Sequence, residues 1–403
     1  MSANSYDIGT AAIDITPPLG VKLAGYGTGP RIADGVGHRL RAEALVCKGD
    51  DGSWAVVTSD LIGYPRDLVT AVRDRVAERT HLAAETVMLS ATHTHSGPSG
   101  VRAYSGRSDL DPVDLDYRPW LEDRLVELVA AAVEAAEPAR FEVAWTDAPP
   151  LASNRRVQST DGVWSNEWRD PDGKHPGYLD PSVMLVGVRR EDGRLAALLV
   201  NYGCHPVTLG PRSMKISADY VGYLKDTLEA RHPGLLAMFA LAGAGNINPR
   251  TCIQVGARYP RAMGEALGEA VLDAMGKLHP VAAGPVAVSH RPWALVTNRE
   301  WRGMPDRKKG ETITTEVMAL RAGDLALVSV PGELFSEYTA LFREASPLPE
   351  TAVVSMGNDS VGYLPTDEAR PQGGHEVNHA ATTDLIEETL QQHVRDALGG
   401  LLA

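Results

Sequence analysis

Three short segments carry side chains that could bind a metal ion or move a proton. The first, ATHTHSGPSG (91–100), places His93 and His95 one residue apart among small and hydroxyl residues. His205 stands in NYGCHP and Glu333 in PGE. Each segment directly follows an apolar run typical of a strand: TVMLS, LAALLVNYG and DLALVSV. Because open α/β sheets place ligand sites at the ends of their strands, we expect these side chains to meet.

Imidazoles combined with one carboxylate are suited to a zinc ion that keeps one coordination position for water. On zinc, the pKa of that water falls to about 7. We therefore expect one Zn²⁺ per chain. Structural roles remain open for each residue: a hydrogen-bonded polar side chain for His93 or His95, and a turn residue for His205. Glu333 also fits a first-turn acid favoured by a helix dipole.

A glycine run, LAGAGNINPR (241–250), follows another predicted strand. Small residues at Gly243, Ala244 and Gly245 would let the backbone approach a ligand and offer N–H donors to an oxyanion. The run lacks both common nucleotide-binding spacings, so a phosphate cradle is disfavoured. A tight turn without a binding role is the alternative.

Composition excludes several classes of partner. The chain has 403 residues, 43% of them hydrophobic, which is enough for a sizeable core. Its formal net charge of −13 disfavours nucleic acid and anionic membranes, since both require a basic footprint. No apolar run approaches the roughly 20 residues of a membrane span. We expect a small-molecule substrate, no nucleic-acid or membrane partner, and leave homo-oligomerisation open.

Cysteine usage and the first residues favour a cytoplasmic location. Cys47, Cys204 and Cys252 are far apart and contain no CxxC pair, which argues against a disulfide framework and a thiolate zinc site. The N-terminus, MSANSYDIGTAAIDITPP, lacks the basic start and apolar core of a secretory signal.

Alternating strand and helix patterns predict one α/β domain over residues 1–403, with mixed β-sheets flanked by helices and an active site at the carboxyl ends of strands. The predicted strands are 54–58, 86–90, 141–145, 183–188, 195–202, 235–240, 286–290, 325–330 and 351–355. The predicted helices are 65–79, 120–136, 220–231, 259–277, 336–344 and 383–398.

Two polar segments, 158–180 and 299–311, contain no such pattern. The first carries Trp164, Trp168 and Tyr178, which could line a pocket. Either segment could be a lid or a solvated surface loop.

Taken together, the motifs of the chain resemble those of the neutral, non-lysosomal ceramidases and their shorter bacterial relatives. The resemblance rests on motifs that follow the family's order along nearly the whole chain: ATHTHSGPSG, SNRR (153–156), NYGCHP, SADYVGY (217–223), GAGNINPR (243–250), PGE, GYLPT (362–366) and GGHE (373–376). It implies zinc-dependent amide hydrolysis. The zinc ligands that it implies are His93, His205, Glu333 and Tyr363.

The resemblance also implies roles for residues around the metal. His95 would face the substrate, and Arg155 would contact its polar head or carbonyl group. His95 or Tyr363 could pass a proton to the leaving amine. Asp60 and Asp219 are further polar candidates, with a buried structural carboxylate or a helix cap as the alternative.

One departure concerns the glycine run, where the ceramidases carry a serine important for amide cleavage. This chain has Gly245, Asn246 and Asn248 in GNINP instead. An amide side chain is no nucleophile, although it can donate a hydrogen bond to an oxyanion. We therefore expect zinc-bound hydroxide to attack directly while Asn248 positions the substrate.

The second departure is length, from which we expect neither the family's C-terminal sandwich domain nor a signal peptide. We expect a smaller, more polar amide or lactam rather than ceramide. Three alternatives stay open. The first is a zinc-dependent biosynthetic enzyme that catalyses amide or lactam formation, cyclisation or elimination. The others are a non-catalytic binding protein with structural zinc, and cysteine chemistry at Cys204. The last is least favoured, because neighbouring residues on a strand face opposite sides.

Overall fold

The computed structural model describes residues 5–27, 31–99, 101, 112–297 and 309–403. Its largest element is a nine-stranded mixed sheet in which eight strands follow the order β13-β11-β10-β6-β1-β3-β4-β5, and β15 pairs with β6. The bounds are β1 (Tyr6–Asp14), β3 (Arg41–Lys48), β4 (Ser53–Ser59), β5 (Val87–Ala91), β6 (Glu137–Asp147), β10 (Ser182–Arg190), β11 (Leu195–Tyr202), β13 (Leu236–Leu241) and β15 (His279–Pro280).

A second sheet of four strands has the order β16-β17-β18-β20. These strands are β16 (Val286–Val296), β17 (Thr312–Ala322), β18 (Leu325–Ser329) and β20 (Glu350–Val354). The two sheets face each other across a core that includes Trp54 and Phe141 from the large sheet and Leu320 and Val354 from the small one. Most of their strands are therefore buried on both faces.

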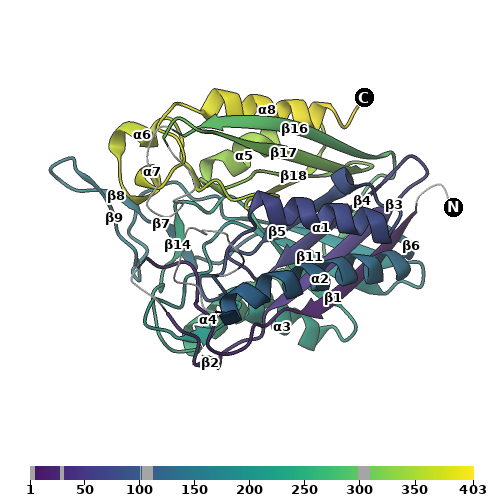
Figure 1. Cartoon of the computed structure of the whole chain (residues 1–403), viewed down its shortest axis with the longest axis horizontal. Coiled ribbons are helices and arrows are strands. Elements are labelled where there is room, and N and C mark those ends of the chain that lie inside the picture. Colours follow the sequence, from purple (N-terminus) through teal and green to yellow (C-terminus); the bar gives the residue numbers. More distant parts are fainter. Residues whose placement is uncertain (1–4, 28–30, 100, 102–111, 298–308) are drawn as a thin grey trace.

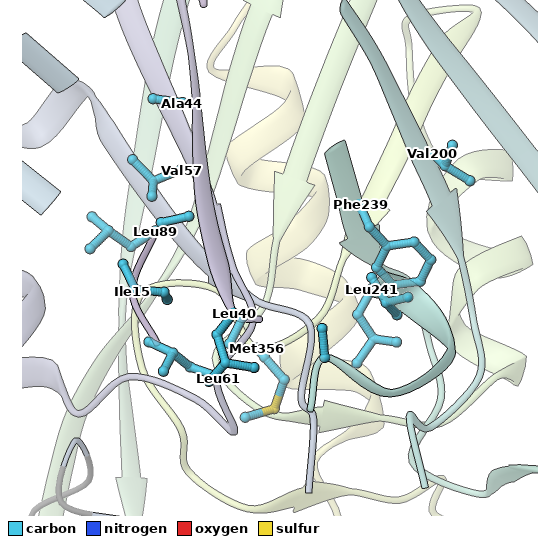
Figure 2. Packing of buried hydrophobic residues seen from close by; sticks show 14 of the residues in the cluster. Ile15, Leu40, Ala44, Val57, Leu61, Leu89, Val200, Phe239, Leu241 and Met356 are labelled. Carbon is cyan, nitrogen blue, oxygen red and sulfur yellow. The ribbon is translucent and has the colours of Figure 1, made fainter. Parts of the chain in front are cut away.

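Helices cover the outer faces, giving four layers (Figure 1). The large sheet packs against α1 (Arg66–Arg79), α2 (Pro112–Glu134), α3 (Asp219–Arg231) and α4 (Arg258–Met275), while the small sheet packs against α5 (Glu337–Glu344) and α8 (Glu387–Gly399). Figure 2 shows part of the core under the large sheet, where strand residues such as Val57, Leu89 and Phe239 point inward.

Short two-stranded pairs join the loops at one end of the sheets. These pairs are β2 (Gly35–Val36) with β12 (Lys215–Ile216), β7 (Ala152–Asn154) with β14 (Ile247–Pro249), β8 (Arg156–Gln158) with β9 (Trp164–Asn166), and β19 (Glu333–Leu334) with β21 (Tyr363–Leu364). The remaining short helices are η1 (Ala84–Thr86), α6 (Ala369–Gln372) and α7 (His375–Asn378).

The predicted α/β class, with mixed sheets flanked by helices, is confirmed. Among the described strands longer than three residues, three were missed: β1, β3 and β17. Their sequences lack a regular alternation of apolar and polar residues. In β3, for example, the charged residue Glu43 is buried in the middle of the strand. The helix predicted over 120–136 begins earlier, at Pro112, with Pro119 inside it. In the described part of the chain, no helix combines the length and apolar character that a membrane crossing requires.

Candidate active site

His93 follows β5 and is held by two backbone carbonyls of the loop after β4. Its N–H donates to the carbonyl of Leu61 at 2.8 Å, and its Nδ1 lies 2.6 Å from the carbonyl oxygen of Ile62. Because a carbonyl only accepts, Nδ1 carries the proton and the Nε2 lone pair is available for a metal. His93 has a left-handed backbone, with φ of 69°, a strain typical of functional positions.

His205, after β11, is fixed in the same tautomer. Its Nδ1 lies 2.6 Å from the carbonyl oxygen of Ala244, in the glycine run that follows β13. Strands β11 and β13 are parallel neighbours, so their ends deliver the histidine and the carbonyl to one place. Burial and then the charge of Arg155 lower the pKa of His205 to about 4, against the opposing effect of Glu333. The ring is therefore neutral near pH 7.

Glu333 and Tyr363 occupy paired positions in the parallel ladder of β19 and β21. The Tyr363 hydroxyl accepts a hydrogen bond from Nη2 of Arg155 at 3.1 Å. Burial would raise the pKa of Glu333, but His93 and His205 outweigh burial and hold it well below its usual range. Burial and Glu333 raise the pKa of Tyr363 well above its usual range, against the charge of Arg155. Ligation by a Tyr363 phenolate would thus need the positive charge of a metal.

The ligand atoms of this cluster converge on one point. Oε2 of Glu333 lies 3.4 Å from Nε2 of His93 and 3.2 Å from Nε2 of His205. A tetrahedral zinc ion with bonds of about 2.0–2.1 Å separates its ligand atoms by roughly 3.3 Å. The three buried side chains therefore fit a zinc ion in spacing, tautomer and charge.

His95 belongs to the same cluster but is held differently. One ligand atom from each of His93, His95 and His205 lies within 4.8 Å of the others. Nε2 of His95 is 3.3 Å from Nε2 of His93, whereas its buried Nδ1 has no hydrogen-bond partner. Metal-binding histidines usually donate their second N–H to a fixed acceptor, and His95 lacks one. Burial, followed by His93 and His205, lowers the pKa of His95 well below its usual range.

The Arg155 guanidinium is engaged mainly by protein groups. Nε donates to Glu376 at 2.6 Å, and Nη2 donates to the Tyr363 hydroxyl at 3.1 Å. Two further bonds reach Asn248 at 3.0 Å and the Gly245 carbonyl at 2.7 Å. Of five N–H groups, four are thus used, which leaves one on Nη1. That N–H group is the one available for the predicted substrate contact, and the shortest contact of Arg155 is the ion pair with Glu376.

The two asparagines of the glycine run also bond to protein. The Asn248 oxygen accepts from Arg155, and its amide nitrogen donates to the carbonyl of Trp168 at 3.2 Å. The Asn246 oxygen accepts the N–H of Ser336 at 2.9 Å, and its nitrogen donates to Glu337 at 2.9 Å. Asn246, which we predicted to bind substrate, joins the glycine run to the start of α5 through these bonds.

The glycine run corrects one prediction, since its glycine N–H groups are not free for an oxyanion. Gly243 donates to Oγ1 of Thr339 at 3.0 Å, and Gly245 donates to the carbonyl of Leu334 at 2.7 Å. A Cβ on Gly245 would lie 2.5 Å from the carbonyl oxygen of Glu333. The small residues therefore allow close backbone packing against β19, and the run offers carbonyls to His205 and Arg155.

The segment 158–180 contributes one aromatic side chain, Trp168, beside Arg155. It contains part of the β8–β9 hairpin, which projects from the molecule in Figure 1. The Arg155 guanidinium lies 5.0 Å from the ring centroid of Trp168. Trp164 lies instead beside Arg156, and Tyr178 is largely exposed. In the other polar segment, residues 299–308 lie outside the described residues.

Sequence reasoning missed His375, Gly25 and Tyr26. The His375 ring packs edge-on against Trp168 and Tyr363, with centroids 5.3 and 5.5 Å apart. Gly25 lies so close to His95 that a Cβ would be 2.4 Å from the imidazole, and Tyr26 packs edge-on against the same ring. The GGHE motif was a signal for His375; nothing local marked the other two.

The remaining candidates have structural positions. Asp219 accepts hydrogen bonds from the backbone of Thr208, Leu209 and Tyr220. Asp60 is paired with a buried lysine. Cys204 is fully buried, and burial raises the pKa of its thiol well above the usual range, which disfavours cysteine chemistry.

The fold and the cluster of His93, His205 and Glu333 together define an α/β protein with a buried candidate metal site at the ends of its strands. Residues 6–262 match the family described as neutral/alkaline non-lysosomal ceramidase, N-terminal. The chain belongs to this family.

Similar proteins include two neutral ceramidases. Neutral ceramidase A of Dictyostelium discoideum is 25% identical over 264 residues, covering 62% of this chain and 36% of that protein. The neutral ceramidase of Pseudomonas aeruginosa is 26% identical over 266 residues, covering 62% and 38%. These matches thus span well under half the length of either relative. The crystal structure of the Pseudomonas aeruginosa enzyme has the same fold, with a TM-score of 0.80 at 19% identity, over 99% of this chain and 74% of that one.

Proposed function

We propose that this protein is a zinc-dependent hydrolase that cleaves a C–N amide or lactam bond of a small or N-acylated substrate. The observation that carries the proposal is the convergence of His93 Nε2, His205 Nε2 and Glu333 Oε2, with both histidines fixed in the metal-binding tautomer by backbone carbonyls. Membership of a family whose relatives are named ceramidases supports an amide as the scissile group.

His93, His205 and Glu333 would hold the zinc ion, with Tyr363 as a further ligand. When bound, zinc would supply Lewis-acid activation of water and of a carbonyl oxygen. Arg155 holds the Tyr363 hydroxyl through Nη2, and the backbone of Tyr363 is paired with that of Glu333. The orientation of Tyr363 is therefore fixed before substrate binds, which is the preorganisation that such sites require.

His95 would act as the proton carrier. It is the histidine of the cluster whose Nδ1 no described carbonyl fixes, so either ring nitrogen can hold the proton. Its Nε2 lies 3.3 Å from Nε2 of His93, within reach of the proposed metal site. Positioned general acids and bases contribute roughly 10²–10⁴-fold to rate.

Asn248 would shape the site through its neighbours. Its amide joins Arg155 to the backbone of Trp168, so it sets the position of Trp168 as well as that of Arg155. The free N–H of Arg155 Nη1 is the group that would contact a substrate carbonyl.

The first test combines metal content with product mass. Elemental analysis of protein purified without added metal should give about one zinc per chain, as expected for a single site. His93→Ala should lose it, whereas His279→Ala, a change at an exposed histidine outside the cluster, should retain it.

Candidate linear amides, lactams and a ceramide would then be incubated with the protein and followed by mass spectrometry. Hydrolysis adds the mass of water; cyclisation or amide formation removes it. A metal-free His93→Ala protein with full activity would contradict the proposal, and water loss would favour the biosynthetic alternative.

A further inference from the structure

Lys225 is a buried cation that the proposed chemistry does not use. It lies on α3 with 1% of its side chain exposed. Its Nζ donates to Glu43 at 2.8 Å and to the two carboxylate oxygens of Asp60 at 2.9 and 2.8 Å. Burial alone would lower the pKa of Lys225, but Asp60 and Glu43 outweigh it and raise the pKa, so the side chain is charged. Removing one member of such a buried pair leaves an uncompensated charge.

Asp60 connects this cation to the turn that holds His93. Asp60 follows β4 directly; its Oδ2 accepts the N–H of Arg41 at 2.9 Å, and its own N–H donates to the Arg41 carbonyl at 2.9 Å. The next two residues, Leu61 and Ile62, present the carbonyls that bind the N–H and Nδ1 of His93. The position of those carbonyls therefore depends on how Asp60 is anchored.

The left-handed backbone of His93 makes this dependence strong. A residue other than glycine keeps a positive φ only when its surroundings over-determine it. Apolar packing holds one part of the turn, since Leu61 lies in the same cluster as Leu40 and Met356 (Figure 2). The ion pair of Asp60 with Lys225 anchors the residue immediately before it.

We infer that Lys225 is a positioning residue for the metal site: through Asp60 it fixes the 60–62 turn, whose Ile62 carbonyl orients His93 for metal binding. The inference rests on the proposed function, because it assumes that His93 binds zinc. It gives a role to Asp60, which contacts none of the proposed ligands directly.

The test measures zinc affinity and ligand geometry in the full chain, not turnover. Lys225→Met should weaken zinc binding about tenfold or more, the size of effect typical when an outer contact of a metal ligand is lost. Dissociation constants would come from competition with a chelating dye, and the visible spectrum after cobalt substitution would report the ligand geometry. A changed cobalt spectrum is expected.

Because Lys225→Met leaves two buried carboxylates, a second variant keeps the charge balanced. Lys225→Met/Glu43→Gln removes one positive and one negative group together and leaves Asp60 beside Arg41. This double variant also removes the ion pair between Lys225 and Asp60, so its zinc affinity should fall as in the single variant.

Glu316→Gln is the matched control. Glu316 is buried and pairs with Arg66 and Arg73 at 2.8 Å each, joining β17 to α1. None of these partners is a proposed metal ligand. The control should lose stability while its zinc affinity and cobalt spectrum stay unchanged.

The outcomes separate the two proposals. If wild-type protein binds no zinc, the proposed function fails. If wild-type protein binds zinc and the folded Lys225 variants bind it with the same affinity and spectrum, the inference is overturned while the function stands. An equal loss of affinity in Glu316→Gln also overturns it, because general loosening of the core would then explain the effect.

Discussion

Nε2 of His205 lies 3.2 Å from Oε2 of Glu333, although 128 residues separate the two in the chain. His205 reaches this point from the end of β11, and Glu333 from β19, which follows β18 of the other sheet. The site therefore spans the ends of both facing sheets, and its geometry depends on how the sheets pack.

Glu333→Gln should strongly weaken metal binding, because it removes the carboxylate ligand while preserving side-chain size. The loss of zinc affinity should exceed the roughly 10–100-fold effect typical of changes around metal ligands. Competition with a chelating dye measures it, and unchanged affinity would exclude Glu333 as a ligand.

His95→Gln should separate binding from catalysis. We expect zinc content to remain at the wild-type level while turnover falls roughly 10²–10⁴-fold, as expected for loss of a proton carrier. Elemental analysis and single-turnover kinetics on one preparation provide both readouts. Loss of zinc in this variant would instead make His95 a ligand.

Asn248→Ser tests the role of the residue that replaces the family's serine. The shorter side chain cannot bridge Arg155 and the Trp168 carbonyl, so the free energy of unfolding should fall by about 1–3 kcal/mol. Urea unfolding measures this change. Zinc content should be unaffected, and a large gain in amide hydrolysis would show that a hydroxyl is what the site lacks.

Glu376 should make stability depend on pH in acid. Burial would raise its pKa, but Arg155 and the hydrogen bonds from Asn166 and Arg155 outweigh burial and lower it from 4.5 to about 2. A depressed carboxyl pKa stabilises the fold above the unfolded value, and this contribution disappears as the pH falls through the folded value. The difference corresponds to about 3 kcal/mol.

Between about pH 5 and pH 2, wild-type protein should therefore lose about 3 kcal/mol more stability than Glu376→Gln. Urea midpoints across this range measure the difference. Parallel curves for the two proteins would show that the Glu376 pair with Arg155 contributes no pH dependence.

Gly245→Ala should disturb the site through the backbone. The added Cβ would lie 2.5 Å from the Glu333 carbonyl oxygen, so β19 must shift, and overpacking of this kind typically costs about 1–3 kcal/mol. Thermal unfolding and zinc affinity should both decline. Gly256→Ala, where a Cβ meets nothing within 4 Å, is the control and should change neither.

The sequence determined the elements that have strong local patterns. Apolar runs marked β4, β5, β11, β13 and β18, and the polar residues directly after three of them drew attention to His93, His205 and Glu333. Strand β17 was not predicted because its first half, TITTE, is largely polar. Its Glu316 can be buried because it pairs with two arginines of α1, which is distant in the chain. Tyr363 was predicted as a ligand only from the family resemblance, since a two-residue strand has no detectable periodicity.

Tertiary structure alone decided what each side chain does. The Ala244 carbonyl fixes the His205 tautomer, Asn248 bonds to Arg155, and Lys225 anchors Asp60. Residue types and periodicity are local properties, so a sequence shows which groups are available. Hydrogen-bond partners and burial depend on contacts between segments far apart in the chain, and packing of the two sheets brings those segments together.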